Sequence, residues 1–155
     1  MQVYLDTYAR HGIRPSIARD VLDTFTESKF DAWLGDEHTT VTVAERDSHL
    51  VGFAHVTIGE GCSLAPAGVQ AELLRLYVQE PFTSQGVGSA LLLSAEADCR
   101  ARGVDVLWLT PWAGNDRALR FYARHGYADH GQTWYDIEGE AIENRVYAKQ
   151  LSRGA

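Results

Sequence analysis

Apolar residues recur at helical spacing in the N-terminal part of the chain. Residues 3–9 and 16–34 follow this pattern, and Gly35 is predicted to end the longer segment. The apolar positions of that segment are Ile17, Val21, Leu22, Phe25, Phe30, Trp33 and Leu34. The spacing therefore predicts two helices before the first strand.

Further along, the pattern becomes one of strands and helices in alternation. Strands are predicted at 40–45, 49–58, 72–78 and 104–109, with two more within 127–151, a hairpin turn at 46–48 and a loop at 59–70. Helices are predicted at 86–102, ended by Gly103, and from a cap at Asn115 to His125. This order predicts an α/β protein with a single domain over residues 1–155, in which helices flank a mixed central sheet.

A glycine pair marks the start of the helix predicted at 86–102. Gly86 and Gly88 follow a strand and a short polar loop, so the backbone can approach a ligand closely and the first N–H groups of the helix point at it. Leu91 stands where a dinucleotide fold needs a small residue, and the lysine of a Walker loop is absent. The segment therefore predicts a phosphate or pyrophosphate held by main-chain N–H groups, with no metal supplied by the motif.

A second motif begins about thirty residues further on. Its residues are Asn115, Ala118, Phe121, Tyr122, Gly126 and Tyr127, in the order Asn-x-x-Ala-x-x-Phe-Tyr-x-x-x-Gly-Tyr. Together with the glycine pair, this motif resembles the signature of the GCN5-related N-acetyltransferase (GNAT) family over roughly residues 40–151. Thr83 stands where that signature has Gln or Arg, so the resemblance implies a main-chain cradle at this point rather than a side-chain contact to the pyrophosphate.

The resemblance implies an enzyme that uses acetyl-CoA as co-substrate, needs no metal, and transfers acetyl to a primary amine by direct attack in a ternary complex. The cofactor-binding residues that it implies are Leu76, Tyr77, Val78, Ser84, Gln85, Gly86, Val87, Gly88, Ser89, Asn115, Ala118 and Arg124. The family usually opens with a strand, whereas this chain begins within a predicted helix. We therefore expect a sheet that lacks the usual first strand, and its open edge near residues 40–44 favours a homodimer.

Two side chains are candidates for acid–base chemistry. Removing the proton of an alkylammonium with a pKa near 10 costs roughly 4 kcal/mol at pH 7, so the amine needs a base, and the leaving thiolate gains from an acid. The resemblance assigns the acid to Tyr122, which could instead be an aromatic anchor. Glu72 is the candidate base, because period two places it on an otherwise apolar strand face where desolvation raises the pKa of a carboxylate. A solvated Glu72, or a water chain as the base, is the alternative.

The acceptor amine is less constrained by the sequence. The segment Trp134-Tyr135-Asp136-Ile137-Glu138-Gly139-Glu140, before a last strand that ends in Lys-x-Leu, resembles the branch that contains PaiA-type polyamine acetyltransferases. Its acidic residues suit a cationic small-molecule amine, and Trp134 with Tyr135 could wall an amine pocket through cation–π contacts. His55 and His130 are alternative proton relays. Peptide N-termini, lysine side chains and amino-acid analogues follow polyamines as candidate acceptors.

Composition and charge narrow the function classes. The net charge is −7, with 14 Lys and Arg against 21 Asp and Glu, so the chain lacks the basic surface of a nucleic-acid-binding protein. No apolar run is long enough to cross a membrane, and the N-terminus lacks a secretory signal. Cys62 and Cys99 lack metal-binding spacing and are expected to be reduced thiols of a cytoplasmic protein. The alternatives are a non-catalytic acyl-CoA-binding domain, which Tyr122 disfavours, and a nucleotide-binding module, which the missing Rossmann and Walker residues disfavour.

Overall fold

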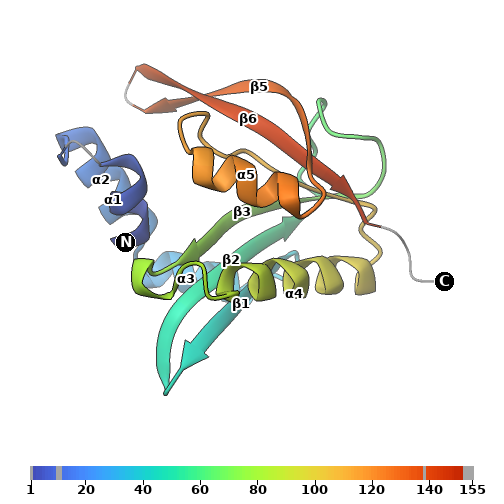
Figure 1. Cartoon of the computed structure of the whole chain (residues 1–155), viewed down its shortest axis with the longest axis horizontal. Helices are drawn as coiled ribbons and strands as arrows, with labels where there is room; N and C mark the ends of the chain where they lie inside the picture. Colours follow the sequence, from blue (N-terminus) through green and yellow to red (C-terminus); the bar gives the residue numbers. More distant parts are fainter. Residues whose placement is uncertain (1, 10–11, 138, 152–155) are drawn as a thin grey trace. The chain divides into compact units, whose positions relative to one another are not determined.

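The computed structural model describes residues 2–9, 12–137 and 139–151, and its strands pair in the order β1-β2-β3-β4-β6-β5 (Figure 1). The strands are β1 (Thr39–Arg46), β2 (His49–Ile58), β3 (Gln70–Val78), β4 (Val106–Leu109), β5 (Ala128–Ile137) and β6 (Glu140–Gln150). The helices are α1 (Gln2–Tyr8), α2 (Pro15–Thr24), α3 (Glu27–Gly35), α4 (Val87–Ala101) and α5 (Asp116–Arg124), with a short 3-10 helix η1 (Glu80–Phe82). This mixed six-stranded sheet with flanking helices confirms the predicted α/β class.

The backbone divides into two compact units. The first unit contains residues 1–55 and 75–94, and the second unit contains residues 56–74 and 95–155. The expectation of a single domain over residues 1–155 stays a prediction.

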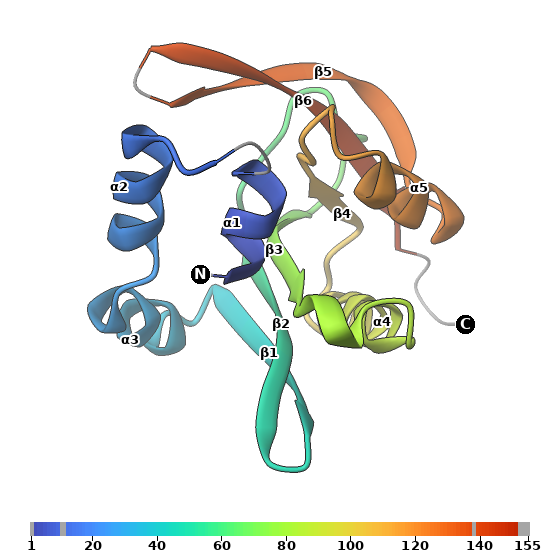
Figure 2. The same cartoon turned by 60° about the vertical axis from the view of Figure 1, so that its left-hand side comes forward.

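In the first unit, β1 and the greater part of β2 form the predicted hairpin. Asp47 and Ser48 have φ of 50° and 61°, the left-handed conformation that a two-residue hairpin turn requires at both central positions. Before β1, the described residues 2–9 and 12–38 contain helices and no strand, as predicted, so β1 lies at one edge of the strand order. Figure 2 shows α1 and α2 side by side, and their buried residues are Tyr4, Ile17 and Val21.

The prediction of one helix over 16–34 is wrong. The segment forms two helices, α2 and α3, separated at Phe25 and Thr26. Thr26 Oγ1 accepts a hydrogen bond from Lys29 N at 3.3 Å and so caps α3. A Thr hydroxyl that satisfies an exposed helix N–H favours this break, whereas the apolar spacing continues across it unchanged. Leu22 and Leu34, two of the apolar positions of that segment, are 59% and 69% exposed.

The two faces of β2 are covered by different elements of the first unit. Phe53 faces α3, because its ring centroid lies 6.2 Å from that of Phe30. Gly52 faces the other way, where an added Cβ would lie 3.2 Å from Leu91 Cδ1 of α4. The same Cβ would lie 2.6 Å from Tyr77 O, so only glycine allows β2 and β3 to approach this closely.

The second unit is built on β4, β5, β6 and the beginning of β3. All four residues of β4 are buried, and this strand pairs in parallel with β3 and in antiparallel with β6. β5 and β6 are the two predicted C-terminal strands, and a register shift interrupts their pairing between Asp129 and Gly131. Along α4, Leu91, Ala95 and Cys99 are buried, whereas Val87 is half-buried.

Helix α5 lies alongside the β5–β6 pair (Figures 1 and 2). Asn115 caps it as predicted, since Asn115 Oδ1 accepts a hydrogen bond from Ala118 N at 3.2 Å. Asp116 lies in the first turn and Arg124 in the last, where each charge complements the helix dipole. Gly126 follows with a φ of 84°, a conformation that ends the helix.

Candidate functional site

The segment predicted to hold a phosphate lies in the first unit, between the end of β3 and the start of α4. Ser84 and Gly86 have φ of 59° and 86°, so the chain passes twice through the left-handed region before the helix begins. The first hydrogen bond of the helix runs from Ala90 N to Gly86 O at 2.9 Å. No group in the described chain accepts a hydrogen bond from the N–H of Val87 or Gly88, so these donors are available to an anion.

At Gly86 the reason for glycine is conformation and not space. An added Cβ would meet nothing within 4 Å, whereas the φ of 86° strains any residue with a side chain. The contacts within the protein therefore leave space at Gly86, and the close approach of a ligand to its backbone stays a prediction. The residue is required for the turn that aims the following N–H groups.

Side-chain contacts fix the loop before the glycine pair. Gln85 Nε2 donates to Pro81 O at 2.7 Å, and Gln85 Oε1 accepts from Arg46 Nη1 at 2.9 Å. Thr83 Oγ1 donates to Glu80 O at 2.8 Å. The side chains of Gln85 and Thr83 are thus engaged by other groups of the protein.

The strand segment Leu76, Tyr77 and Val78 leads into this loop. Tyr77 turns its ring into the aromatic core of the first unit, with ring centroids 5.4 Å from Phe53 and 6.1 Å from Phe25. The contact of Tyr77 with the cofactor stays a prediction.

Tyr122, the predicted acid, lies on α5 in the second unit. It is 8% exposed, and its ring packs at a steep angle on that of Tyr127, with centroids 5.8 Å apart. Asn115 and Ala118, two predicted cofactor residues, are bonded to each other in the helix cap, and Arg124 is exposed in the last turn. These four predicted residues therefore lie on α5 or, in the case of Asn115, cap it.

A buried carboxylate, Glu96, binds the hydroxyl of Tyr127, whose ring packs on Tyr122. The sequence did not predict this residue. Glu96 on α4 is 0% exposed and accepts hydrogen bonds from Lys149 Nζ at 2.8 and 2.9 Å, Arg100 Nη2 at 2.9 Å and Tyr127 OH at 3.2 Å. Burial, and then the charge of Glu96, raise the pKa of Tyr127 far above its ordinary value, so its hydroxyl stays protonated as a donor. This cluster holds the Tyr127 ring against Tyr122. Its one signal in the sequence is an acidic residue within the apolar stripe of α4.

Glu72, the predicted base, lies on β3 in the second unit, opposite Trp108 of β4. Leu74, two residues further along the same face, is 40% exposed, whereas Ala71 and Leu73 on the other face are 0% and 3% exposed. The apolar face that carries Glu72 is therefore the more open one. Glu72 itself is half-buried, and its desolvation and its role as base stay predictions.

His55, considered as a proton relay, belongs instead to a buried pair in the first unit. It is 2% exposed, and its Nδ1 lies 2.9 Å from Arg75 Nη1. The ring of Trp33 lies 4.5 Å from the imidazole, centroid to centroid. Burial, and then the charge of Arg75, lower the pKa of His55 to about 4, so the ring is neutral at pH 7. His130, the other histidine considered, is half-buried on β5.

The described acidic and aromatic residues of the segment 134–140 are exposed. Trp134 and Tyr135 on β5 are 58% and 52% exposed, and as consecutive strand residues they point to opposite faces. They therefore cannot wall one pocket together. Asp136 and Glu140 are also exposed, and Glu138 lies outside the described residues.

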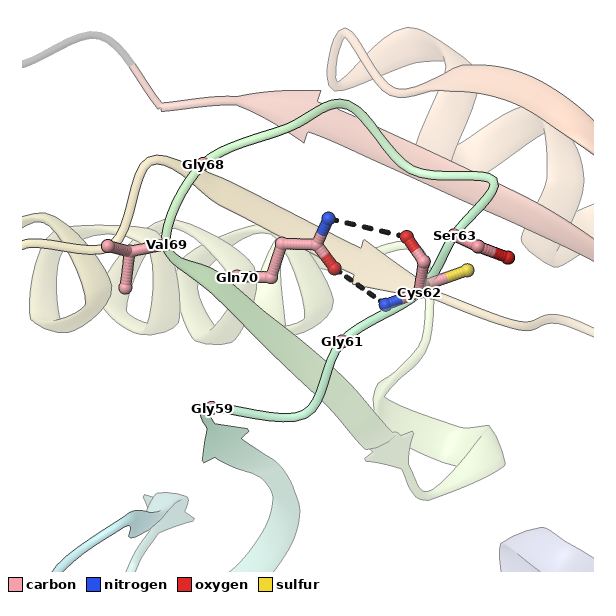
Figure 3. Close-up of a pocket in the computed structure, with 7 residues that line it drawn as sticks. All are labelled: Gly59, Gly61, Cys62, Ser63, Gly68, Val69 and Gln70. Carbon is pink, nitrogen blue, oxygen red and sulfur yellow. Dashed lines mark hydrogen bonds between the residues drawn. The ribbon is translucent and has the colours of Figure 1, made fainter.

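A pocket opens beside the loop at residues 59–69 in the second unit (Figure 3). Gln70 stretches across this loop, accepting from Cys62 N at 2.6 Å and donating to Cys62 O at 3.3 Å and Pro66 O at 2.8 Å. The lining residues are Gly59, Gly61, Cys62, Ser63, Gly68, Val69 and Gln70. Because none of these is a predicted site residue, the pocket gives no support to the predicted chemistry.

In the part of the chain that the structure describes, no group of three His, Cys, Asp or Glu side chains could hold a metal ion. Cys62 and Cys99 are free thiols, and burial raises the pKa of Cys99 to about 11. Within residues 2–9, 12–137 and 139–151, no helix has the length and apolar character that crossing a membrane demands.

Comparison with known proteins adds a family and several relatives. Residues 8–127 match the model of the acetyltransferase (GNAT) family. An uncharacterized N-acetyltransferase of Lactobacillus delbrueckii subsp. lactis is 24% identical over 127 residues, which cover 81% of this chain and 72% of the relative. A spermidine N1-acetyltransferase of Thermoplasma acidophilum is 32% identical over 81 residues, which cover 52% of this chain and 45% of the relative.

Two solved structures show the same fold. The PaiA N-acetyltransferase of Thermoplasma acidophilum, solved in complex with coenzyme A, has a TM-score of 0.70 and 23% identity, with 96% of this chain and 86% of that chain covered. NAA60 of Arabidopsis thaliana, solved with a bisubstrate analogue, has a TM-score of 0.69 and 21% identity, with 90% of this chain and 96% of that chain covered.

Proposed function

The chain belongs to the acetyltransferase (GNAT) family, and on that premise we propose that it transfers acetyl from acetyl-CoA to the primary amine of a small molecule. The observation that carries the proposal is the turn at Ser84 and Gly86, which leaves the N–H groups of Val87 and Gly88 without acceptors at the start of α4. These donors, and the helix dipole behind them, suit the pyrophosphate of coenzyme A.

The reaction is direct aminolysis of a thioester in a ternary complex. The amine nitrogen attacks the acetyl carbon, the C–S bond breaks, and the products are an N-acetylated amine and free coenzyme A. Glu72, directly or through water, takes a proton from the ammonium group so that its nitrogen can attack, and Tyr122 donates a proton to the leaving thiolate. In support, Tyr122 is the Tyr of the Phe-Tyr pair in the family motif, and the Glu96–Tyr127 contact fixes the ring that packs on it.

Polyamines are the first candidate acceptors among small amines. The support is the likeness to the spermidine acetyltransferase and the exposed acidic residues of the C-terminal hairpin, Asp136 and Glu140. A peptide N-terminus or a protein lysine is the second candidate, because the ribosomal-protein-S18-alanine N-acetyltransferase of Escherichia coli has the same fold, with a TM-score of 0.65 and 21% identity.

The test is to incubate the purified protein with acetyl-CoA and a panel of polyamines, amino acids and peptides, following thiol release and acetylated product. We expect product from at least one small amine, and a loss of product in Tyr122→Phe. Acetyl-CoA binding without any acetylated product would instead support a non-catalytic acyl-CoA-binding domain.

Two further expectations rest on the sequence. We propose that the protein works in the cytoplasm, with Cys62 and Cys99 reduced, and that it forms a homodimer through the edge strand β1. The residues of that edge, 40–44, carry no lysine or proline that would discourage pairing with another chain.

A further inference from the structure

Arg75 on β3 is held by aromatic rings and a neutral histidine, not by a carboxylate. Its guanidinium carbon lies 4.7 Å from the ring centroid of Trp33 and 5.9 Å from that of Phe25, and its Nη1 lies 2.9 Å from His55 Nδ1. These residues all belong to the first unit. Within the described residues, no Asp or Glu pairs with Arg75.

Other half-buried cations of this chain have carboxylate partners. Lys149 and Arg100 pair with Glu96 at 2.8 and 2.9 Å, and Arg145 pairs with Asp129 at 3.0 Å. A half-buried cation normally needs such compensation, because removal from water disfavours the charged form. Arg75 departs from this rule.

The hydrogen bond to His55 leaves a second unsatisfied group. A guanidinium can only donate, so His55 Nδ1 is the acceptor and the ring proton resides on Nε2. That nitrogen is buried and has no hydrogen-bond partner in the described chain. The pair therefore presents donors without acceptors: the Nε2–H of His55 and those N–H groups of Arg75 that His55 does not use. An oxygen-rich anion can accept from the remaining N–H groups of Arg75, whereas His55 Nε2–H points away from Arg75, on the other side of the imidazole ring.

The position of Arg75 on β3 relates it to the proposed cofactor segment. Leu76, Tyr77 and Val78 follow it directly, and Tyr77 lies on the same strand face. With a rise of about 3.3 Å per residue, Arg75 lies roughly 7–10 Å along the strand from Tyr77 and Val78. A small acceptor whose amine reaches a thioester held along this segment can place a second group at that separation.

We propose that Arg75 binds a carboxylate of the acceptor, so that the substrate is a small primary amine that also carries a carboxylate group. This inference rests on the proposed function and narrows its acceptor. Arg75 would take the carboxylate in two parallel N–H···O bonds, with Trp33 covering the guanidinium face and His55 acting as a positioning residue. A polyamine has no carboxylate for Arg75 to bind, so this inference places amines that carry a carboxylate ahead of the polyamines among the candidate acceptors.

The experiment uses pairs of compounds that differ by one carboxylate. The pairs are lysine and cadaverine, ornithine and putrescine, and tyrosine and tyramine. For wild-type protein we expect kcat/KM to be at least about tenfold higher for the amino acid than for the amine in one or more pairs. Arg75→Gln should lower the value for that amino acid by about 10- to 100-fold, mainly through KM, and change the value for the amine less than about threefold.

Two further variants serve as controls. Arg75→Lys keeps the charge but loses the two-bond geometry, so its kcat/KM for the amino acid should lie between those of wild type and Arg75→Gln. Arg102→Gln removes an exposed arginine that follows α4. It should leave the ratio of kcat/KM between amino acid and amine unchanged in every pair. Retained activity of Arg75→Gln on the amine shows that the variant is folded.

The outcomes separate the inference from the proposed function. Acetylation of amines with no preference for the carboxylate, or equal loss of activity on both members of a pair in Arg75→Gln, overturns the inference and leaves acetyl transfer intact. If no compound is acetylated, the proposed function fails, and equilibrium binding of lysine and cadaverine in the presence of coenzyme A then decides the role of Arg75. Lysine binding that Arg75→Gln abolishes supports a carboxylate site, whereas absent or unchanged lysine binding overturns it.

Discussion

The buried His55 makes a specific prediction for stability in acid. Burial, and then the neighbouring charge of Arg75, lower its pKa from 6.5 to about 4 in the folded chain. In the unfolded chain the imidazole recovers its ordinary value. The unfolded state therefore binds a proton as the pH falls below 6.5 while the folded state resists it, so the free energy of unfolding should decrease over the window from pH 6.5 to 4.

The size of the effect follows from the shift. Each pKa unit corresponds to about 1.4 kcal/mol, so a shift from 6.5 to about 4 limits the contribution of His55 to roughly 3 kcal/mol. At pH 4.5 most of this difference is already expressed, roughly 2.5 kcal/mol, and at pH 7.5 almost none of it is. His55 is 2% exposed, so solvent screening removes little of this amount.

The assay compares urea unfolding of wild type and His55→Gln at pH 7.5 and 4.5. Glutamine does not titrate and keeps an oxygen that can accept from Arg75 Nη1, so the variant isolates the protonation of the ring. At each pH, the free energy of unfolding of wild type is compared with that of the variant. We expect wild type to lose roughly 2–3 kcal/mol relative to the variant when the pH is lowered from 7.5 to 4.5. All other titrating groups contribute equally to both proteins and cancel.

Nuclear magnetic resonance gives the second measurement. The imidazole signal of His55, assigned by its absence in His55→Gln, should begin to titrate only near pH 4. In Arg75→Gln it should titrate at higher pH but still below 6.5, because burial is the larger cause and Arg75 the smaller. A midpoint near 6.5 in wild type, or unfolding energies that fall equally in both proteins, would contradict the buried neutral pair.

Four other outcomes follow from the site. Gly86→Val should weaken acetyl-CoA binding about tenfold, because valine resists a φ of 86°, and an unchanged dissociation constant in calorimetry would remove the cradle. Tyr122→Phe should lower kcat about 10²-fold with acetyl-CoA affinity nearly constant, whereas normal turnover would leave Tyr122 with a structural role only. Glu72→Gln should lower kcat/KM most at low pH, where the unprotonated amine is scarce, and a pH profile equal to that of wild type would exclude Glu72 as base. Light scattering at micromolar concentration should show a homodimer, and a species of 17.2 kDa throughout would refute pairing through the β1 edge.

The sequence predicted those features whose causes lie within a few residues of each other. The cap of α5 needs only Asn115 and Ala118, and the hairpin turn needs only the two residues between its strands. The break between α2 and α3 is also local, at Thr26, but the apolar spacing on either side continued through it and favoured one helix. Periodicity reports which face is buried and is insensitive to where the backbone changes direction.

The polar groups inside the two units escaped prediction for a different reason. Glu96 is stable without exposure because donors converge on it, and two of them, Lys149 and Tyr127, lie 53 and 31 residues away in the sequence. Arg75 likewise meets His55 from 20 residues away. Local motifs are therefore sufficient to predict the class of reaction, since the proposed cofactor site consists of a turn and a helix start. The choice of acceptor depends on charges that tertiary packing brings together, and substitutions at Arg75 should change substrate preference without changing the reaction.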